Sequence, residues 1–367
     1  MIRVSSPYIT EEDIEAVVSV LRSGMLAFGS VGKEFEEALA RYLGVKHVVA
    51  VSNGTTALYL SLKGLGVGPG DEVVVPDFTF FATASTAALA GATPVLVDID
   101  LDTYTIDVGD VERVLTERTK IVVPVHLYGH PADMDQLLSL SRERGVLILE
   151  DCAQALGSEY RGVKVGSIGH AGALSFYPTK NITTCEGGAI TTNLDDVAEY
   201  VRLARNHGQR SRYYHVMLGW NMRMTDVQAA LGLSQLRRLD EMIERRRRLA
   251  KLYFEEFEGV THLRLPYEKP WAKHSYNLFT VWVEGEGVRD KLANYLRERG
   301  VETAIHYPIP LHRQPALANV KKSPGCCPKS EEASKHVLTL PLHPGLRDED
   351  VRVVSALVKR FFAEHRP

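Results

Sequence analysis

Residues 47–65 have the sequence HVVAVSNGTTALYLSLKGL, in which two kinds of pattern meet. Residues 47–51 are a short apolar run typical of a buried strand, and residues 55–65 have the apolar spacing of a helix. A strand followed directly by a helix is the repeating unit of α/β folds. Recurrence of this pattern would therefore decide the fold class.

The strand–helix pattern recurs as far as residue 195. Further strands are expected at residues 72–75, 94–98, 120–127 and 146–150, with helices at 81–90 and 134–144. Nearly continuous apolar runs are typical of strands that helices cover on both faces. We therefore predict an α/β fold with a mostly parallel sheet, which binds its ligands beyond the carboxyl ends of the strands.

The second half of the chain predicts a smaller domain. One long amphipathic helix is expected to begin at Thr225, its N-cap, and to continue through Leu239 to about residue 257 as the connector. We expect a large domain over residues 1–245, with residues 1–15 as an arm against the small domain, and a small α+β domain over 246–367. The other expected elements are strands at 187–192 and 276–283, helices at 195–205, 288–299, 329–337 and from about 348, and a loop over 308–328.

Charge and composition narrow the class of protein. The chain has 367 residues, and 43 Lys and Arg against 46 Asp and Glu give a formal charge of −3. This charge argues against nucleic acid or an acidic membrane as a partner. Four consecutive arginines, 245–248, are interpreted as a solvated helix face paired with Glu241 and Glu244.

The sequence also argues against a membrane segment and a metal site. The most apolar stretch, residues 82–97, is too short to span a bilayer, and residues 1–13 lack the apolar region of a signal peptide. We expect a cytoplasmic protein. The four cysteines have no zinc-ribbon spacing, and the adjacent Cys326 and Cys327 are interpreted as incidental rather than as a metal site or redox switch.

The opening stretch contains a candidate phosphate site. Residues 52–56 (SNGTT) follow the strand and open the helix, where free N–H groups and the helix dipole attract a phosphate. Gly54 permits close approach of the backbone, and Thr55 adds a hydroxyl. Ordinary helix capping explains the same residues, so this motif does not stand alone.

Two further strand ends carry reactive side chains. Asp151 follows the strand at 146–150, and its carboxylate either holds a heterocyclic nitrogen protonated or caps a helix. Lys180 follows the apolar segment 174–177, and it either forms a Schiff base and shuttles a proton or is a solvated surface lysine. A phosphate site, a carboxylate and a lysine in this order favour pyridoxal 5'-phosphate (PLP), whose protonated pyridine accepts electrons after proton loss.

These motifs resemble the DegT/StrS-type sugar-nucleotide aminotransferases, a branch of the fold-type I PLP enzymes. The resemblance covers about residues 24–236 and resumes at 306–315. It implies a fold with a seven-stranded, mostly parallel sheet. Its markers are residues 52–58, 76–83 (PDFTFFAT), 125–129 (VHLYG), 150–154 (EDCAQ), 175–188 (SFYPTKNITTCEGG) and 220–225 (WNMRMT).

The resemblance implies a role for each matching residue. Lys180 would carry PLP as a Schiff base and act as general base and acid, and Asp151 would pair with the pyridine nitrogen. The other implied cofactor contacts are Gln154 near the ring hydroxyl, Gly54, Thr55 and Ser175 at the phosphate, and Phe80 stacked on the ring. Asn221 would reach the phosphate from a neighbouring subunit, which implies a homodimer. Phe80 as a core aromatic and Asn221 as a turn residue are the alternatives.

A second group of matching residues is implied to approach the sugar nucleotide. It comprises His306, Tyr307 and His312 in the C-terminal segment, and His207 after the helix at 195–205. Histidines in loops are more often surface or packing residues, which is the alternative here. His126, in an apolar run, is interpreted as a core histidine with satisfied hydrogen bonds.

The implied reaction moves an amino group from an amino acid, by resemblance L-glutamate, to a keto-sugar nucleotide. Residues 183–188 and 221–225 favour position four of the hexose over position three. Related sugar dehydratases carry His at the lysine position, so Lys180 argues against that alternative. A regulatory or sugar-nucleotide-binding protein without turnover is the other alternative. Cys185 stands where family members commonly carry Gly, which predicts a changed turn after Lys180.

Overall fold

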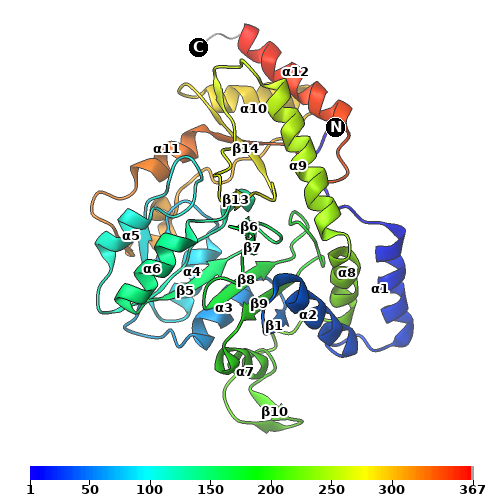
Figure 1. Cartoon of the computed structure of the whole chain (residues 1–367), viewed down its shortest axis with the longest axis vertical. Coiled ribbons are helices and arrows are strands. Elements are labelled where there is room, and N and C mark those ends of the chain that lie inside the picture. The colour runs from blue at the N-terminus through cyan, green and yellow to red at the C-terminus, as the bar shows by residue number, and fades with distance from the viewer. Residues whose placement is uncertain (365–367) are drawn as a thin grey trace.

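The computed structural model describes residues 1–364 and confirms the predicted α/β fold (Figure 1). Residues 365–367, the end of the predicted small domain, lie outside the described part. A central eight-stranded sheet has the order β1-β9-β8-β5-β4-β2-β3-β15. Its strands are β1 (His47–Val51), β2 (Glu72–Pro76), β3 (Thr93–Val97), β4 (Thr119–Val122), β5 (Leu147–Asp151), β8 (Ala171–Ser175), β9 (Gly188–Thr192) and β15 (Lys321–Lys322).

The sheet is mostly parallel, as predicted, because only β9 runs antiparallel to its neighbours β1 and β8. Seven strands come from the large domain, and β15 adds an eighth beside β3. The sequence-based loop over residues 308–328 is therefore wrong at β15. The pairing was not visible in the sequence because Lys321 and Lys322 lack an apolar strand pattern, and their partner strand is more than 200 residues away.

Helices cover both faces of the sheet, and apolar clusters fill each interface. Capping explains several helix ends: Asp133 Oδ1 accepts the N–H of Gln136 at the start of α6, and Gly145 ends it with φ 69°. The helices of the large domain are α1 (Glu11–Ser23), α2 (Ser30–Leu43), α3 (Gly54–Gly64), α4 (Ala82–Leu89), α5 (Val108–Val114), α6 (Met134–Arg144), α7 (Asp195–Ala204) and α8 (Asp226–Leu236).

The single connector helix that the sequence predicted is wrong, because the structure has two helices there. Helix α8 ends at Leu236, and α9 (Leu239–Glu256) continues into the small domain (Figure 1). Arg238 has φ −112° and ψ 6°, outside the helical range, and donates to buried Asp13 of α1 at 2.7 Å. We attribute the break to this contact, which a chain-local pattern does not reveal.

A separate apolar cluster forms the core of the smaller unit, packed between α9, α10, α12 and a three-stranded sheet. Ile2 pairs with Val301 and packs on this cluster, and the N–H of Leu342 donates to the carbonyl of Val4. The boundary at residue 245 stays a prediction. The elements are β12 (Leu263–Arg264), β14 (Phe279–Val283), β16 (Val337–Leu340), α10 (Val288–Glu298), α11 (Pro328–His336) and α12 (Asp348–Glu364).

The interpretation of residues 245–248 as a solvated face paired within the helix is wrong for 245–247, although Arg248 is exposed. Arg246 is buried and donates to the carbonyls of Tyr276, Asn277 and Leu342. Its neighbours pair with distant acids, Arg245 with Asp348 and Arg247 with Glu268. The run fastens α9 to the small domain, because a buried guanidinium can satisfy several carbonyls at once.

The remaining elements are short. They are β6 (Glu159–Tyr160), β7 (Val163–Lys164) and β13 (Ala272–Lys273), the hairpin β10 (Gln209–Ser211) and β11 (Tyr214–His215), and the 3-10 turns η1 (Leu127–Gly129), η2 (Leu311–Arg313) and η3 (Pro315–Leu317). The hairpin projects at the end of the molecule opposite the small domain (Figure 1). Over residues 1–364, no helix has the length and apolar character needed to cross a bilayer.

Candidate active site

Strand β5 delivers Asp151 to the carboxyl end of the sheet, where its side chain is buried. Oδ1 accepts the N–H of Ala153 at 3.1 Å, and Oδ2 accepts the hydroxyl of Thr83 at 2.9 Å. Burial raises the pKa of Asp151, while these two donors and the charge of Lys180 oppose the rise. The result is a fixed carboxylate in an apolar setting, which a nearby cationic nitrogen would stabilise.

The residue before Asp151 is equally fixed. The buried carboxylate of Glu150 accepts three backbone N–H groups from residues 166–169, at 2.7–2.8 Å. It also faces Nε2 of His126 at 3.0 Å, while Nδ1 of His126 accepts the N–H of Ala132 at 2.9 Å. This confirms His126 as a satisfied core histidine, although it lies beyond the end of β4. The network holds the end of β5 in place.

Lys180 lies in the turn after β8, where its N–H donates to the carbonyl of Tyr177 at 2.9 Å. Burial lowers the pKa of Lys180 to about 8, and the charge of Asp151 opposes the shift. A lysine with this pKa has an appreciable neutral fraction near physiological pH. A neutral amine is the form that attacks a carbonyl carbon or accepts a proton.

Helix α3 starts against the end of β8. A Cβ on Gly54 would lie 2.8 Å from the Cβ of Ser175, so only glycine lets these two segments approach so closely. Asn53 caps the helix by accepting the N–H of Thr56 at 2.8 Å, and Thr55 is exposed. The first amides of the helix are unpaired within it, which makes this end suitable for a phosphate.

Residues 306 and 307 lie on the other side of the candidate site, opposite the end of β5. The amide of Gln154 accepts the N–H of Tyr128 and donates to the hydroxyl of Tyr307, both at 2.9 Å. The hydroxyl of Tyr128 donates to the carbonyl of His306. Burial and the charge of Lys180 lower the pKa of His306 to about 4, so its ring is neutral. Tyr307 therefore contacts Gln154, and His306 lies within reach of the charge of Lys180.

The aromatic position beside this group is open. The side chain of Phe80 is 57% exposed, and its ring centroid lies 6.2 Å from that of Tyr307. An exposed phenyl ring next to buried polar groups can stack on a planar ligand. The geometry thus agrees with the stacking role better than with a core aromatic.

Three predicted residues are not brought to Lys180. Within residues 1–364, His207, Asn221 and His312 form no hydrogen bond or ion pair with Lys180, Asp151 or Gln154. His207 and Asn221 are exposed at the base of the hairpin β10–β11, while the ring of His312 faces Asp77 and Glu331. Their substrate or partner roles stay predictions.

Sequence reasoning missed two residues of the site. Thr83 lies in the marker stretch 76–83, but the sequence did not show that the start of α4 faces the end of β5. Tyr128 has φ 59°, an unusual value for a non-glycine residue, at a turn that points it to His306. An aromatic residue directly before Gly129 was the only available signal for this turn.

The residues present fit PLP. A helix N-terminus faces a serine for the phosphate, a buried carboxylate suits the pyridine nitrogen, and a lysine of lowered pKa suits the aldehyde carbon. Each is at the carboxyl end of a strand, where such folds bind ligands. Fold and site together define a PLP-dependent aminotransferase.

Comparison with known proteins agrees and gives the family. Residues 7–359 match the DegT/DnrJ/EryC1/StrS aminotransferase family, so the chain belongs to this family of sugar aminotransferases. It is 39% identical to the "Pleiotropic regulatory protein" of Geobacillus stearothermophilus, over 99% of this chain and 98% of that protein. It is 41% identical to the dTDP-3-amino-3,4,6-trideoxy-alpha-D-glucose transaminase of Streptomyces venezuelae, over 93% of this chain and 90% of the relative.

A solved relative supports the cofactor. The putative sugar aminotransferase Spr1654 from Streptococcus pneumoniae has structures in a PLP form and a PMP form. Each superposes with a TM-score of 0.93, at 33% and 32% identity respectively, over 98% of this chain and 98% and 99% of the solved chains. The enzyme therefore uses pyridoxal phosphate.

Proposed function

We propose that this enzyme transfers the amino group of L-glutamate to a keto-sugar nucleotide and so produces an amino-sugar nucleotide. The observation that carries the proposal is that a lysine of lowered pKa, Lys180, lies with the buried carboxylate Asp151 at the carboxyl ends of the sheet strands. Aminotransfer needs one group that moves a proton and one that stabilises a cationic ring nitrogen, and these two residues supply them.

Lys180 is proposed to hold the cofactor through Nζ and, once the donor amine displaces it, to move protons. PLP, when bound, supplies the conjugated ring that accepts the electron pair of the broken C–H bond. Nζ takes the proton from the α-carbon of glutamate and returns it to the cofactor carbon that is bonded to the glutamate nitrogen. In the second half of the cycle, Nζ delivers a proton to the sugar carbon that carried the ketone.

The neighbours of Lys180 have supporting roles in this proposal. Asp151 keeps the ring nitrogen protonated, and Thr83 with the N–H of Ala153 fixes its two oxygens. Gln154 faces the ring hydroxyl, and Phe80 stacks on the ring face. Gly54, Thr55 and Ser175 bind the phosphate.

We propose that His306 and Tyr307 face the sugar substrate. Tyr307 contacts Gln154, the charge of Lys180 reaches His306, and the neutral ring of His306 can exchange hydrogen bonds with sugar hydroxyls without adding a charge. Closure by this segment excludes water from the proton transfers, which strengthens the electrostatic contacts inside. His207 and His312 have no such contact here.

We propose a homodimer in which Asn221 reaches the phosphate in the neighbouring subunit. Asn221 is exposed in the single chain, next to a hairpin region whose Tyr213 and Leu218 are 78% and 91% exposed. Large exposed apolar side chains of this kind mark an interaction surface. We expect mixed dimers of Lys180→Ala and Asn221→Ala chains to regain activity, because one of their two sites is intact. No recovery in mixed dimers of confirmed composition would contradict the shared site.

The position of amination is tested directly with two substrates. The sequence favours position four, whereas the Streptomyces transaminase is named for a 3-amino sugar. The purified enzyme with PLP and L-glutamate should be offered 3-keto and 4-keto hexose nucleotides, and the products identified by NMR. Amination of the 4-keto sugar supports the proposal, and amination of only the 3-keto sugar contradicts the assignment to position four.

The regulatory alternative predicts a different outcome in the same assay. A chain that binds sugar nucleotides without turnover would give no amino sugar and no 2-oxoglutarate with any keto-sugar nucleotide. The proposal requires both products in equal amounts. Location in the cytoplasm remains a prediction of the sequence.

A further inference from the structure

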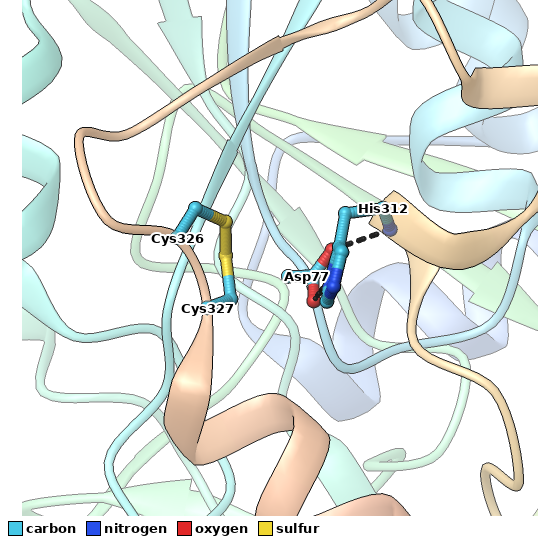
Figure 2. Close-up of side chains that lie close together, drawn as sticks. All are labelled: Asp77, His312, Cys326 and Cys327. Atoms are coloured by element: carbon cyan, nitrogen blue, oxygen red, sulfur yellow. Dashed lines mark hydrogen bonds and ion pairs between the residues drawn. A yellow bond between two sulfur atoms is a disulfide. The ribbon is translucent and has the colours of Figure 1, made fainter.

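Residues 306–331 form a segment that we call the strap. It leaves the small domain, adds β15 to the edge of the main sheet and ends in the first turn of α11. Along it, His312, Cys326 and Cys327 come next to Asp77, which directly follows β2 (Figure 2). One potential ligand atom from each of these four residues lies within 4.8 Å of all the others.

The four side chains come from two distant parts of the chain, the end of β2 and the strap, and meet below the surface. Asp77 and Cys327 are 0% and 1% exposed, and the side chain of His312 is 7% exposed. Asp77 Oδ2 lies 2.7 Å from His312 Nδ1, and Asp77 Oδ1 accepts the backbone N–H of His312 at 2.7 Å. The cluster therefore has fixed geometry on its nitrogen and oxygen side.

The ring of His312 is unusual because both of its nitrogens face carboxylates. Nδ1 faces Asp77, and Nε2 faces Glu331 at 2.9 Å. A neutral ring carries only one N–H, so a ring that binds a metal ion through Nδ1 keeps its N–H on Nε2. Histidine that binds zinc through one nitrogen typically donates the other N–H to a carboxylate, as Nε2 can to Glu331.

A second cluster of potential metal ligands provides a comparison. His126, Glu150 and Cys152 also lie within ligand distance of one another. There Nδ1 of His126 accepts a backbone N–H, so its lone pair is used, and Glu150 accepts three backbone N–H groups. This cluster offers three ligand groups with a single sulfur, and fixed backbone N–H groups occupy its nitrogen and carboxylate oxygens, so we assign no site to it.

We propose that Asp77, His312, Cys326 and Cys327 bind one Zn²⁺ ion when the two cysteines are reduced. Two thiolates, an imidazole nitrogen and a carboxylate oxygen are a ligand set that zinc accepts in tetrahedral sites. Glu331 and the backbone N–H of His312 orient the histidine and the aspartate from outside. The inference is independent of the proposed transfer reaction and replaces the interpretation of the cysteine pair as incidental.

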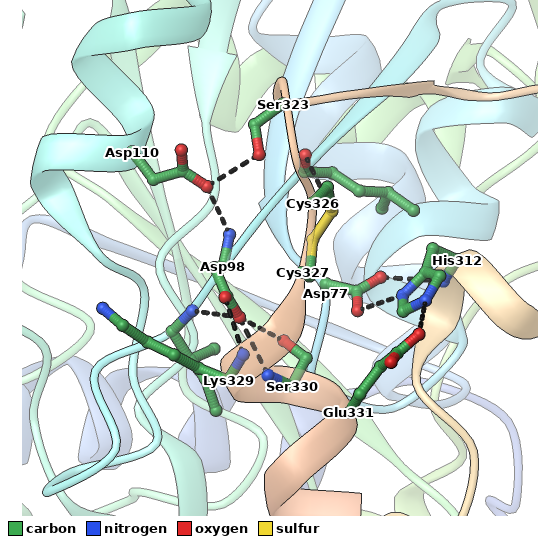
Figure 3. The surroundings of a disulfide bond; sticks show 12 residues. Asp77, Asp98, Asp110, His312, Ser323, Cys326, Cys327, Lys329, Ser330 and Glu331 are labelled. Atoms are coloured by element: carbon green, nitrogen blue, oxygen red, sulfur yellow. Dashed lines mark hydrogen bonds and ion pairs between the residues drawn. A yellow bond between two sulfur atoms is a disulfide. The ribbon is translucent and has the colours of Figure 1, made fainter.

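The oxidation state of the cysteines controls the site. The structure joins Cys326 and Cys327 by a disulfide (Figure 3), and a disulfide offers no thiolate. Two small thiols reduce it: Cys–S–S–Cys and two RSH give two Cys–SH and RSSR. Binding of Zn²⁺ then releases the two thiol protons. The site is open in a reducing environment and closed in an oxidising one.

Zinc at this point would fasten the strap to the main sheet. The strap begins with His306 and Tyr307, and Tyr307 accepts a hydrogen bond from Gln154. Hydrogen bonds already hold its far end: Ser323 donates to Asp110, and Lys329 and Ser330 donate to Asp98 (Figure 3). The ion would add a fastening in the middle, and it would stabilise the folded chain by binding it selectively.

The test is zinc binding by the PLP-loaded enzyme after reduction with a phosphine, which leaves no competing thiol in solution. A chromophoric zinc chelator gives the affinity by competition, and X-ray absorption at the zinc edge gives the ligands. We expect one Zn²⁺ per chain with two sulfur neighbours at about 2.3 Å. The protein in its disulfide form has the fold described above and should bind no Zn²⁺ at this affinity.

Variants assign the ligands. Cys326→Ser, Asp77→Asn and His312→Gln should each weaken zinc binding, and Glu331→Gln should weaken it about 10- to 100-fold. Cys185→Ser, at an exposed cysteine outside the strap, is the matched control and should bind as the unchanged chain does. Zinc without two sulfur neighbours, equal binding by the disulfide form, or unchanged affinity in Cys326→Ser would overturn the proposal.

Discussion

Two regions of this molecule are built in opposite ways. The active-site edge (Asp151, Gln154, Ser175 and Lys180) sits at the ends of adjacent strands β5 and β8, and each residue is placed by the strand just before it. The strap is placed by side chains from distant segments, such as Asp77 on His312 and Asp98 on Ser330. We therefore expect changes at the edge to alter chemistry, and changes at the strap to alter stability.

The largest expected effect is at the active-site edge. Asp151→Asn keeps the shape of the side chain but removes the charge that would stabilise a cationic ring nitrogen. We expect kcat to fall about 10²- to 10³-fold, as for the loss of other fixed electrostatic groups. The melting temperature should change little. Steady-state kinetics and thermal melts of the same preparation measure both, and a stability loss with normal turnover would reverse the assignment.

The strap should respond the other way. The buried carboxylate of Asp98 accepts the N–H groups of Lys329 and Ser330 and the hydroxyl of Ser330, at 2.8–2.9 Å. Asp98→Asn replaces one of the two accepting oxygens by an N–H₂ group that faces a donor, and we expect a loss of about 2 kcal/mol of unfolding free energy.

Asp102→Asn is the matched control for this change, because Asp102 is exposed and its ion pair with Lys269 lies at the surface. It should cost less than about 1 kcal/mol in the same urea titration. Equal losses for both variants would mean that the strap is not held by its buried hydrogen bonds.

Elements placed by local sequence were predicted well, and those placed by distant side chains were not. Helix α6 and the strands β1, β2, β5 and β9 lie within a residue or two of their predicted bounds, because local patterns set them. The break before α9 and the roles of Arg246 and His312 depend on partners far along the chain. One sequence shows which residues can pair, but not which of them the fold brings together.

His130 is buried where the two domains meet, and we expect it to make the free energy of unfolding depend on pH. Burial lowers the pKa of His130 to about 4, while its ring accepts the N–H of Lys269. Since the unfolded chain binds a proton there at about pH 6.5, this stability is present above pH 6.5 and is lost as the pH falls toward 4. We expect a loss of about 2 kcal/mol from this group at pH 5.

Urea titrations from pH 7.5 to 4.5 measure this dependence. His130→Gln removes the titrating ring, so its stability should fall less steeply than that of the unchanged chain over the same interval. Identical slopes for the two proteins would show that His130 does not contribute to the acid sensitivity.

The smallest effect is expected next to the active-site edge. Cys185 has φ 67°, in the left-handed region that favours glycine. Cys185→Gly relieves this strain but gives the unfolded chain more conformational freedom, and the two effects oppose each other. We expect a net gain of about 0.5 kcal/mol in the free energy of unfolding. Cys185→Ser retains the strained backbone and should give no gain. A loss in the glycine variant would mean that the cysteine side chain itself stabilises the turn.

Borohydride reduction identifies the lysine that carries the cofactor. The PLP-loaded enzyme is reduced with borohydride, digested and mapped by mass spectrometry. We expect the reduced cofactor to be attached to the peptide that contains Lys180, and the Lys180→Ala chain to retain none. Attachment at another lysine, or equal attachment in the Lys180→Ala chain, would show that Lys180 does not carry the cofactor.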